Sequence, residues 1–279
     1  MRVFVTGDEH YSSYLGTEGW LADTVAKAND LAADLYIHIG DILDNPLQEY
    51  VALRRASNYH SYAGRVNFYN NTIKPILNNF TGQYGWLYIA GNHEMSIHAK
   101  AIVEAFGYWY KQVVLGDVLF LLLNTNDSGD FYMPYVGTRQ LWAIKQAIDT
   151  YSDKICIALG HVALLSLTDM REAMAWGDTG YAYGYDTVRN AATVVNYLNT
   201  HPRFAGYGHA HWSPAAAGYD NTTTPILQVY KRHHQFFYEP SPGLKDSFVI
   251  DINTVTGQVD WNVWKYDTNT LNLIISVTV

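Results

Sequence analysis

Trp86-Leu87-Tyr88-Ile89-Ala90-Gly91-Asn92-His93-Glu94 is a stretch in which an apolar run passes directly into polar residues. Its first half, residues 86–90, is a short apolar run of the kind found in the buried strands of parallel sheets. The run ends at Gly91, where glycine lets the backbone turn sharply and leaves room for a ligand. The stretch therefore predicts a buried strand that delivers Asn92 and His93 to one end of a sheet.

Four other apolar runs end in the same way. We predict buried strands over Val3–Thr6, Leu35–Ile39 and Ile155–Leu159, and a further run spans Phe204–Tyr207. Because the carboxyl ends of strands in an open α/β sheet line one crevice, we expect all five motifs to converge there. The polar groups that follow these four runs are Asp8-Glu9-His10, Gly40-Asp41-Ile42-Leu43-Asp44, Gly160-His161 and Gly208-His209-Ala210-His211.

Helical patterns separate the strands in the first half of the chain. Apolar residues recur at helical spacing between residues 21 and 31. Pro46 marks the start of a second helical stretch towards Phe80, with breaks expected near Gly64 and Pro75. A third helix is predicted from Thr138 to about residue 149. This β-α-β alternation favours mostly parallel strands covered by helices.

The second half is expected to be more antiparallel. Residues 113–119 predict a hairpin that turns at Gly116-Asp117. Residues 247–253 and 259–266 flank another turn at Thr256-Gly257. The interval Val162–Tyr185 follows a strand directly, and we predict that it borders the cleft and helps to select the leaving group, since loops of this length are commonly functional.

The residue types in the five motifs fit metal binding. Asp, Asn and His offer donors that suit Mn, Fe, Zn, Ni or Co better than Ca. Alternation along an extended segment puts Asp8 and His10 on one side, and likewise His209 with His211. The candidate groups are too many for one tetrahedral ion. A carboxylate can bridge two ions roughly 3.5–4 Å apart, which is the two-metal clamp for displacement at phosphorus. We therefore expect two divalent or trivalent transition-metal ions, with manganese among the candidates.

In order and content, the five motifs resemble those of the calcineurin-like metallophosphoesterases. That pattern is Asp-x-His, Gly-Asp-x-x-Asp, Gly-Asn-His-Glu/Asp, Gly-His and Gly-His-x-His, and this chain matches every element between Asp8 and His211. The resemblance implies an α/β fold, a four-layer αββα sandwich of two mixed β-sheets flanked by helices. We expect a single domain over residues 1–279, in which residues 212–279 supply C-terminal strands that complete the sandwich.

The resemblance also implies a ligand set for each metal ion. It assigns one ion to Asp8, His10 and His211. It assigns the other to Asn92, His161 and His209. Asp41 is the bridging carboxylate in this interpretation.

His93 and Asp44 carry the catalytic roles that the resemblance implies. His93 points to the substrate and protonates the leaving oxygen or stabilises the transition state. Asp44 orients His93, because a hydrogen bond to one ring nitrogen fixes the tautomer and raises the basicity of the other nitrogen.

The expected activity is hydrolysis of phosphate mono- or diesters by in-line attack of a hydroxide that bridges the two ions. We expect a phosphatase or phosphodiesterase with a small phosphorylated substrate. One alternative is a nuclease acting on DNA or RNA, which the acidic balance does not favour. The other is a catalytically silent metal-binding interaction module of the same fold.

Composition bounds the partners and the location. The chain has 279 residues, a net charge of -8 and one cysteine, Cys156, which lies in an apolar run and predicts a buried strand residue. An acidic surface gives no general attraction for nucleic acid or an anionic membrane. The sequence has neither a signal-peptide pattern nor an apolar run long enough to span a bilayer. We expect a cytoplasmic protein, while an extracellular or virion-associated location and the oligomeric state stay open.

Overall fold

The computed structural model describes the chain in nine stretches. The described residues are 1–7, 19–42, 61–96, 99–127, 133–164, 187–210, 228–230, 247–265 and 268–279.

Two mixed β-sheets form the centre of the molecule. Among the described residues, one sheet has six strands in the order β11-β10-β9-β1-β2-β3, and the other has five in the order β4-β5-β6-β7-β8. The strands of the first sheet are β1 (Arg2–Thr6), β2 (Leu35–His38), β3 (Trp86–Tyr88), β9 (Ser247–Asn253), β10 (Gln258–Lys265) and β11 (Thr270–Thr278). Those of the second are β4 (Lys111–Leu115), β5 (Val118–Leu123), β6 (Ile155–Gly160), β7 (Phe204–His209) and β8 (Gln228–Tyr230).

Strand direction divides each sheet into two parts. β1, β2 and β3 run parallel to one another, whereas β9 pairs antiparallel with β1 and continues through β10 and β11. In the second sheet β5 to β8 are parallel and only β4 is antiparallel. Both predicted hairpins are confirmed, but the second half is less antiparallel than expected because β6, β7 and β8 run parallel to β5, the second strand of the first hairpin. The parallel part of each sheet ends in the motif loops.

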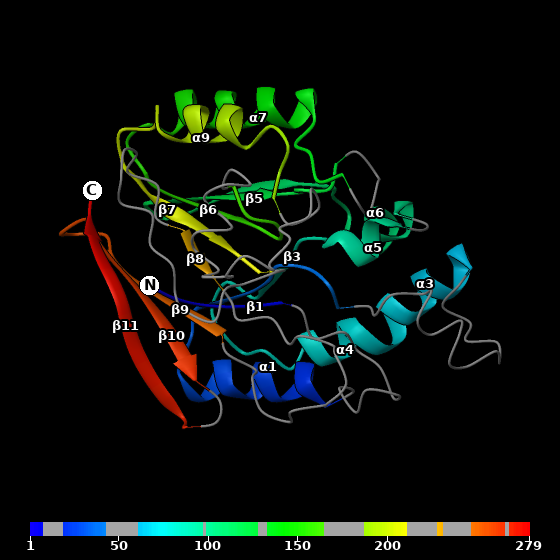
Figure 1. Ribbon diagram of the computed structural model, residues 1–279. Coiled ribbons are helices and arrows are strands. Elements are labelled where there is room, and N and C mark those ends of the chain that lie inside the picture. The colour runs from blue at the N-terminus through cyan, green and yellow to red at the C-terminus, as the bar shows by residue number, and fades with distance from the viewer. Residues whose placement is uncertain are drawn as a thin grey trace, which may run out of the picture.

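Helices cover the outer faces of both sheets, which gives four layers (Figure 1). In Figure 1, α7 and α9 lie above the second sheet and α1 lies below the first. The helices on the first sheet are α1 (Trp20–Asp30), α3 (Tyr62–Phe68), the π-helical turn η2 (Tyr69–Ile73), α4 (Lys74–Leu77) and α6 (Lys100–Phe106). Those on the second are α7 (Thr138–Thr150) and α9 (Ala191–Leu198), and the short helix α5 (Asn92–Ser96) follows β3. The predicted αββα sandwich is therefore confirmed. No helix in the described part of the chain is long and apolar enough to cross a bilayer.

Three apolar layers hold these elements together. The central layer packs the two sheets face to face, with Val5 and Ile37 from one sheet and Phe120 and Ile157 from the other. Trp261 joins the sheets directly, because its buried indole N–H donates to the carbonyl oxygen of Ala205 at 3.1 Å. The other two layers lie between each sheet and its helices.

The predicted elements match their observed bounds closely, with one exception. The break predicted near Pro75 is wrong, because α3, η2 and α4 follow one another without interruption. Proline lacks the N–H that an α-helix needs at that position, and the helix widens to a π-helical turn just before it instead of ending. Gly64 lies in the first turn of α3, where its N–H donates to the Ser61 hydroxyl at 3.0 Å. The helix start predicted at Pro46 lies outside the described residues.

Candidate metal centre

Two loops of the first sheet interlock at the carboxyl ends of their strands. Asp41 follows β2 and is fully buried in a left-handed conformation with φ of 55°. Its N–H donates to Glu94 Oε2 at 2.8 Å, and the N–H of Gly91 donates to the same oxygen at 2.8 Å. Glu94 is also fully buried, so one carboxylate oxygen joins the loop after β2 to the loop after β3.

The glycine at position 91 is required by this close approach. A Cβ atom at that position would lie 2.1 Å from Asp41 Oδ1. Any larger residue would therefore push the Asp41 carboxylate away from its observed position.

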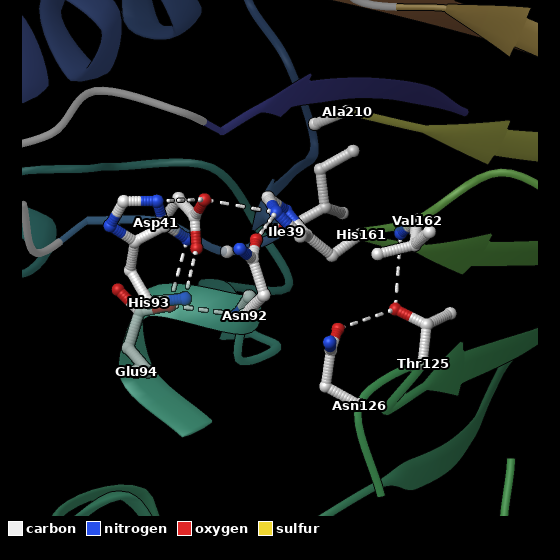
Figure 2. Close-up of polar contacts among 12 residues, drawn as sticks. Ile39, Asp41, Asn92, His93, Glu94, Thr125, Asn126, His161, Val162 and Ala210 are labelled. Carbon is white, nitrogen blue, oxygen red and sulfur yellow. Dashed lines mark hydrogen bonds and ion pairs between the residues drawn. The ribbon is translucent and has the colours of Figure 1, made fainter. Parts of the chain in front are cut away.

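Side-chain atoms of His161 and Asn92 converge beside the Asp41 carboxylate. The Nε2 atom of His161 lies 3.1 Å from Asp41 Oδ2 and 2.9 Å from Asn92 Oδ1. All three side chains are buried. In Figure 2 the Asp41 carboxylate lies between the rings of His161 and His93, with Asn92 beside His161.

The chemistry of these atoms fits a cation. His161 Nδ1 lies 2.9 Å from the carbonyl oxygen of Ile39, so it carries the proton in the neutral ring, and the lone pair is on Nε2. Nε2 then faces two oxygen acceptors, and three lone-pair donors cannot satisfy one another by hydrogen bonding. A metal ion accepts all three, and carboxylate, amide and imidazole suit a transition metal. Burial of the Asp41 carboxylate also favours a neighbouring positive charge.

His209 lies on the neighbouring strand at the same edge. Its Nδ1 is 2.8 Å from the carbonyl oxygen of Ala210, which leaves the lone pair of the neutral ring on Nε2. The N–H of Ala210 donates to the carbonyl oxygen of His161 at 3.1 Å, so the ends of β6 and β7 stay in contact beyond the strands.

The end of β1 also reaches this place. A Cβ atom at Gly7 would lie 3.1 Å from the carbonyl oxygen of Gly40 and 3.4 Å from the Cβ of Ala210. The strand that precedes Asp8 therefore ends between a loop of the first sheet and a loop of the second.

The structure describes some of the predicted site residues and not others. It brings together Asp41, Asn92 and His161, and it places His209 on the adjacent strand end. Asp8, His10, Asp44 and His211 lie outside the described residues. Among the described residues no group of three or more His, Cys, Asp and Glu side chains forms a complete metal site. Asn92 is an amide and therefore not one of these four residue types. Three predicted ligands, Asp8, His10 and His211, lie outside the described residues.

His93 differs from the predicted ligands in its exposure. Its backbone N–H donates to Asp41 Oδ1 at 2.9 Å, and its Nε2 lies 3.7 Å from Asp41 Oδ2. The side chain is 13% exposed, whereas those of Asp41 and His161 are fully buried. The ring therefore lies at the open side of the cluster.

The sequence did not predict the residues that hold the backbone around the cluster in place. Glu94 belongs to the motif Gly91-Asn92-His93-Glu94, but the motif alone does not indicate what this residue does. Arg65 is buried in α3, and its Nη1 donates to the carbonyl oxygen of Glu94 at 3.1 Å. Thr125 is the third residue that supports the site, through its contact with Val162. It lies in the polar run that directly follows the apolar strand β5, and the same change from apolar to polar residues marks the five motifs.

Two buried tyrosines complete the surroundings of Glu94. Burial, reinforced by the negative charge of Glu94, raises the pKa of both Tyr69 and Tyr88 well above the ordinary value. Both phenols are therefore neutral at physiological pH. The single cysteine is a buried residue of β6, as predicted, and burial raises the pKa of its thiol.

The chain is thus a four-layer α/β sandwich with a buried Asp, Asn and His cluster at the carboxyl ends of its strands. The family model described as calcineurin-like phosphoesterase matches residues 1–213. The chain belongs to this family, as its motifs predict.

Solved structures share the fold at low sequence identity. A dimetal phosphatase from Danio rerio is 9% identical with a TM-score of 0.62, over 99% of this chain and 98% of that chain. The structure of PhoD is 10% identical with a TM-score of 0.55, over 100% of this chain and 72% of that chain. Comparison with curated protein sequences found no significant match.

Proposed function

We propose that this protein is a dinuclear metal-dependent phosphoesterase that hydrolyses a small phosphorylated substrate. The observation that carries the proposal is the convergence of Asp41 Oδ2, Asn92 Oδ1 and His161 Nε2 at one buried point, in a member of this family. The Danio rerio neighbour, described as a dimetal phosphatase, supports two ions.

In this proposal Asp41 binds both ions. The ligands of one ion are Asn92, His161 and His209, and those of the other are Asp8, His10 and His211. Two bound ions supply Lewis acidity, which polarises the phosphoryl oxygens and lowers the pKa of an attacking water. The candidate metals remain Mn, Fe, Zn, Ni and Co.

The chain's own residues supply position and proton transfer. Burial of Asp41, Asn92 and His161 keeps bulk water from competing for the ligand atoms. His93 lies at the open side of the cluster, with its backbone fixed by the Asp41 carboxylate, and gives its ring proton to the leaving oxygen. Asp44 orients that ring.

Metal content tests the ligand assignment. Native protein reconstituted with Mn, Zn or Fe should bind close to two ions per chain, and a chelator should abolish hydrolysis of phosphate esters. Asp41→Ala should weaken both sites, whereas Asn92→Ala should mainly weaken one. Asp149→Ala is the matched control, because that carboxylate forms an exposed ion pair with Lys145. Full occupancy in Asp41→Ala would reject the bridging role.

The leaving group tests the role of His93. His93→Ala should retain both ions but lose activity, because an alkoxide needs a proton far more than p-nitrophenolate does. General acid catalysis contributes about 10²–10⁴-fold, so the loss with an alkyl phosphate should approach that range and the loss with p-nitrophenyl phosphate should be smaller. Equal losses would reject proton transfer while leaving the metal centre intact. Comparison with bis-p-nitrophenyl phosphate separates monoesterase from diesterase activity.

A further inference from the structure

The residue that follows His161 is held by side chains from both neighbouring strands. The N–H of Val162 donates to Thr125 Oγ1 at 3.0 Å, and its carbonyl oxygen accepts from Tyr207 Oη at 2.7 Å. Thr125 follows β5 and Tyr207 belongs to β7, the two strands that flank β6. The N–H and the carbonyl oxygen of Val162 are thus fixed from opposite sides.

Glycine at position 160 makes room for this arrangement. A Cβ atom there would lie 2.3 Å from Tyr207 Oη and 2.8 Å from Thr125 Cγ2. The glycine of the Gly-His motif is therefore explained by the threonine and tyrosine that pack against it.

Burial makes these contacts persistent. Thr125 and Tyr207 are both fully buried, so neither hydroxyl can exchange its partner for water without a large cost. The Thr125 hydroxyl accepts from Val162 and therefore donates to Asn126 Oδ1 at 3.3 Å, which fixes its direction. The ring of Tyr207 also stacks on that of His209, with 6.0 Å between ring centroids.

These contacts leave His161 little freedom. Its carbonyl oxygen accepts from Ala210, its Nδ1 pairs with the carbonyl oxygen of Ile39, and the next residue is held by the two hydroxyls. The remaining ring nitrogen, Nε2, then faces Asp41 and Asn92.

We infer that Thr125 and Tyr207 are positioning residues for His161, and that they set the affinity of the metal ion which His161 binds. The inference rests on the proposed function. The two hydroxyls act through the Val162 peptide and touch neither the ion nor the substrate. They limit the positions that His161 Nε2 adopts, which lowers the entropy lost when the ion binds.

Metal affinity, measured by competition with a coloured chelator, tests the inference without any assay of activity. Thr125→Val and Tyr207→Phe remove one hydroxyl each, and Phe keeps the ring that stacks on His209. Each variant should bind one ion as the native chain does and the other up to about 10-fold more weakly, the lower end of the cost of losing a direct partner of a metal ligand, because the hydroxyls act on His161 through the next residue. The visible spectrum of the Co(II)-loaded protein should change in both variants. Thr125→Ser keeps the hydroxyl and should restore affinity and spectrum.

Thr24 and Tyr36 provide matched controls. Their hydroxyls lie 2.9 Å apart, both side chains are buried, and they belong to α1 and β2 on the outer side of the first sheet. Thr24→Val and Tyr36→Phe should lower thermal stability and leave both metal affinities unchanged. Native affinity in both Thr125→Val and Tyr207→Phe, or equal weakening in the controls, would overturn the inference while the proposed function stands. A native chain that binds no transition metal would instead overturn the proposed function.

Discussion

Glu94 shows how one side chain can set the separation of two loops. Its Oε2 accepts the N–H groups of Asp41 and Gly91 at 2.8 Å each, and the residue is fully buried. Since both bonds end on one oxygen, a carbonyl oxygen at the same place could accept them equally. The charge and the hydrogen bonds of Glu94 can therefore be separated experimentally.

Glu94→Gln should cost much less stability than Glu94→Ala. Alanine leaves two buried N–H groups without acceptors, at about 1–3 kcal/mol each, whereas the glutamine carbonyl keeps both bonds. Urea unfolding of the two variants measures the difference. Glu104→Ala, at an exposed glutamate of α6 that accepts a hydrogen bond from the exposed Tyr62, is the control and should change stability by about 0.5 kcal/mol or less. If Gln and Ala variants are equally unstable, the charge and not the hydrogen bonding is what matters.

The motif residues were predictable from the sequence, but the supports behind them were not. Asp41, Asn92 and His161 follow apolar runs at strand ends, and this local pattern is visible in the chain. Glu94 and Arg65 act through main-chain groups that approach only in the fold. The backbone N–H groups that a carboxylate accepts hydrogen bonds from depend on how two segments pack in the fold. Neither the hydrophobic periodicity nor the motif spacing of the sequence predicts that packing.

Among the secondary-structure elements, the short apolar runs predicted their strands well. The helix break that was predicted from Pro75 is wrong. Pro75 was expected to break the helical stretch, but the apolar face that α4 and η2 bury against the first sheet keeps the helix continuous through a π-helical turn. Tertiary packing therefore outweighed the local cost of proline.

The turn between α9 and β7 should give the protein a pH-dependent stability. His201 is buried there, its Nε2–H donates to the carbonyl oxygen of Tyr151 at 3.1 Å, and its Nδ1 accepts from the N–H of Arg203 at 3.1 Å. Burial, together with the charge of Arg203, lowers the pKa of His201 below its ordinary value. Protonation of Nδ1 would remove the bond from Arg203.

The sign of the effect follows from the lowered pKa. The unfolded chain takes up the proton first as the pH falls, so this contribution to stability is complete above about pH 6.5 and is lost as the pH falls towards the lower folded pKa. NMR titration should place the pKa of His201 below that ordinary value. His201→Gln should reduce the fall in stability over this window, measured against the native chain in urea. An unchanged pH profile in His201→Gln would contradict the assignment.

At the scale of the molecule, the candidate centre lies where the two sheets meet. Asp41 follows β2 and Asn92 begins α5 after β3, both on the first sheet, whereas His161 and His209 come from strand ends of the second. The sequence predicted most of the strands, though not β8 or β11, and it did not predict their order, because the pairing of β9 with β1 joins residues about 250 positions apart and leaves no local signal. The site depends on that global order.

An ion bound between the two sheets should stabilise the whole fold. An ion that binds only the native state adds about 2.7 kcal/mol when its concentration is 100 times Kd. In domains of roughly this size, 1 kcal/mol of stability shifts Tm by about 2–4 °C. Saturation of one metal site should therefore raise Tm by about 5–10 °C relative to the Tm of chelator-treated protein. Differential scanning calorimetry of the two forms measures the shift. Asp41→Ala should lose most of it, because its carboxylate serves both ions, whereas Asp149→Ala should keep it. An equal rise in Asp41→Ala would mean that the metal stabilises the protein from somewhere other than the junction of the sheets.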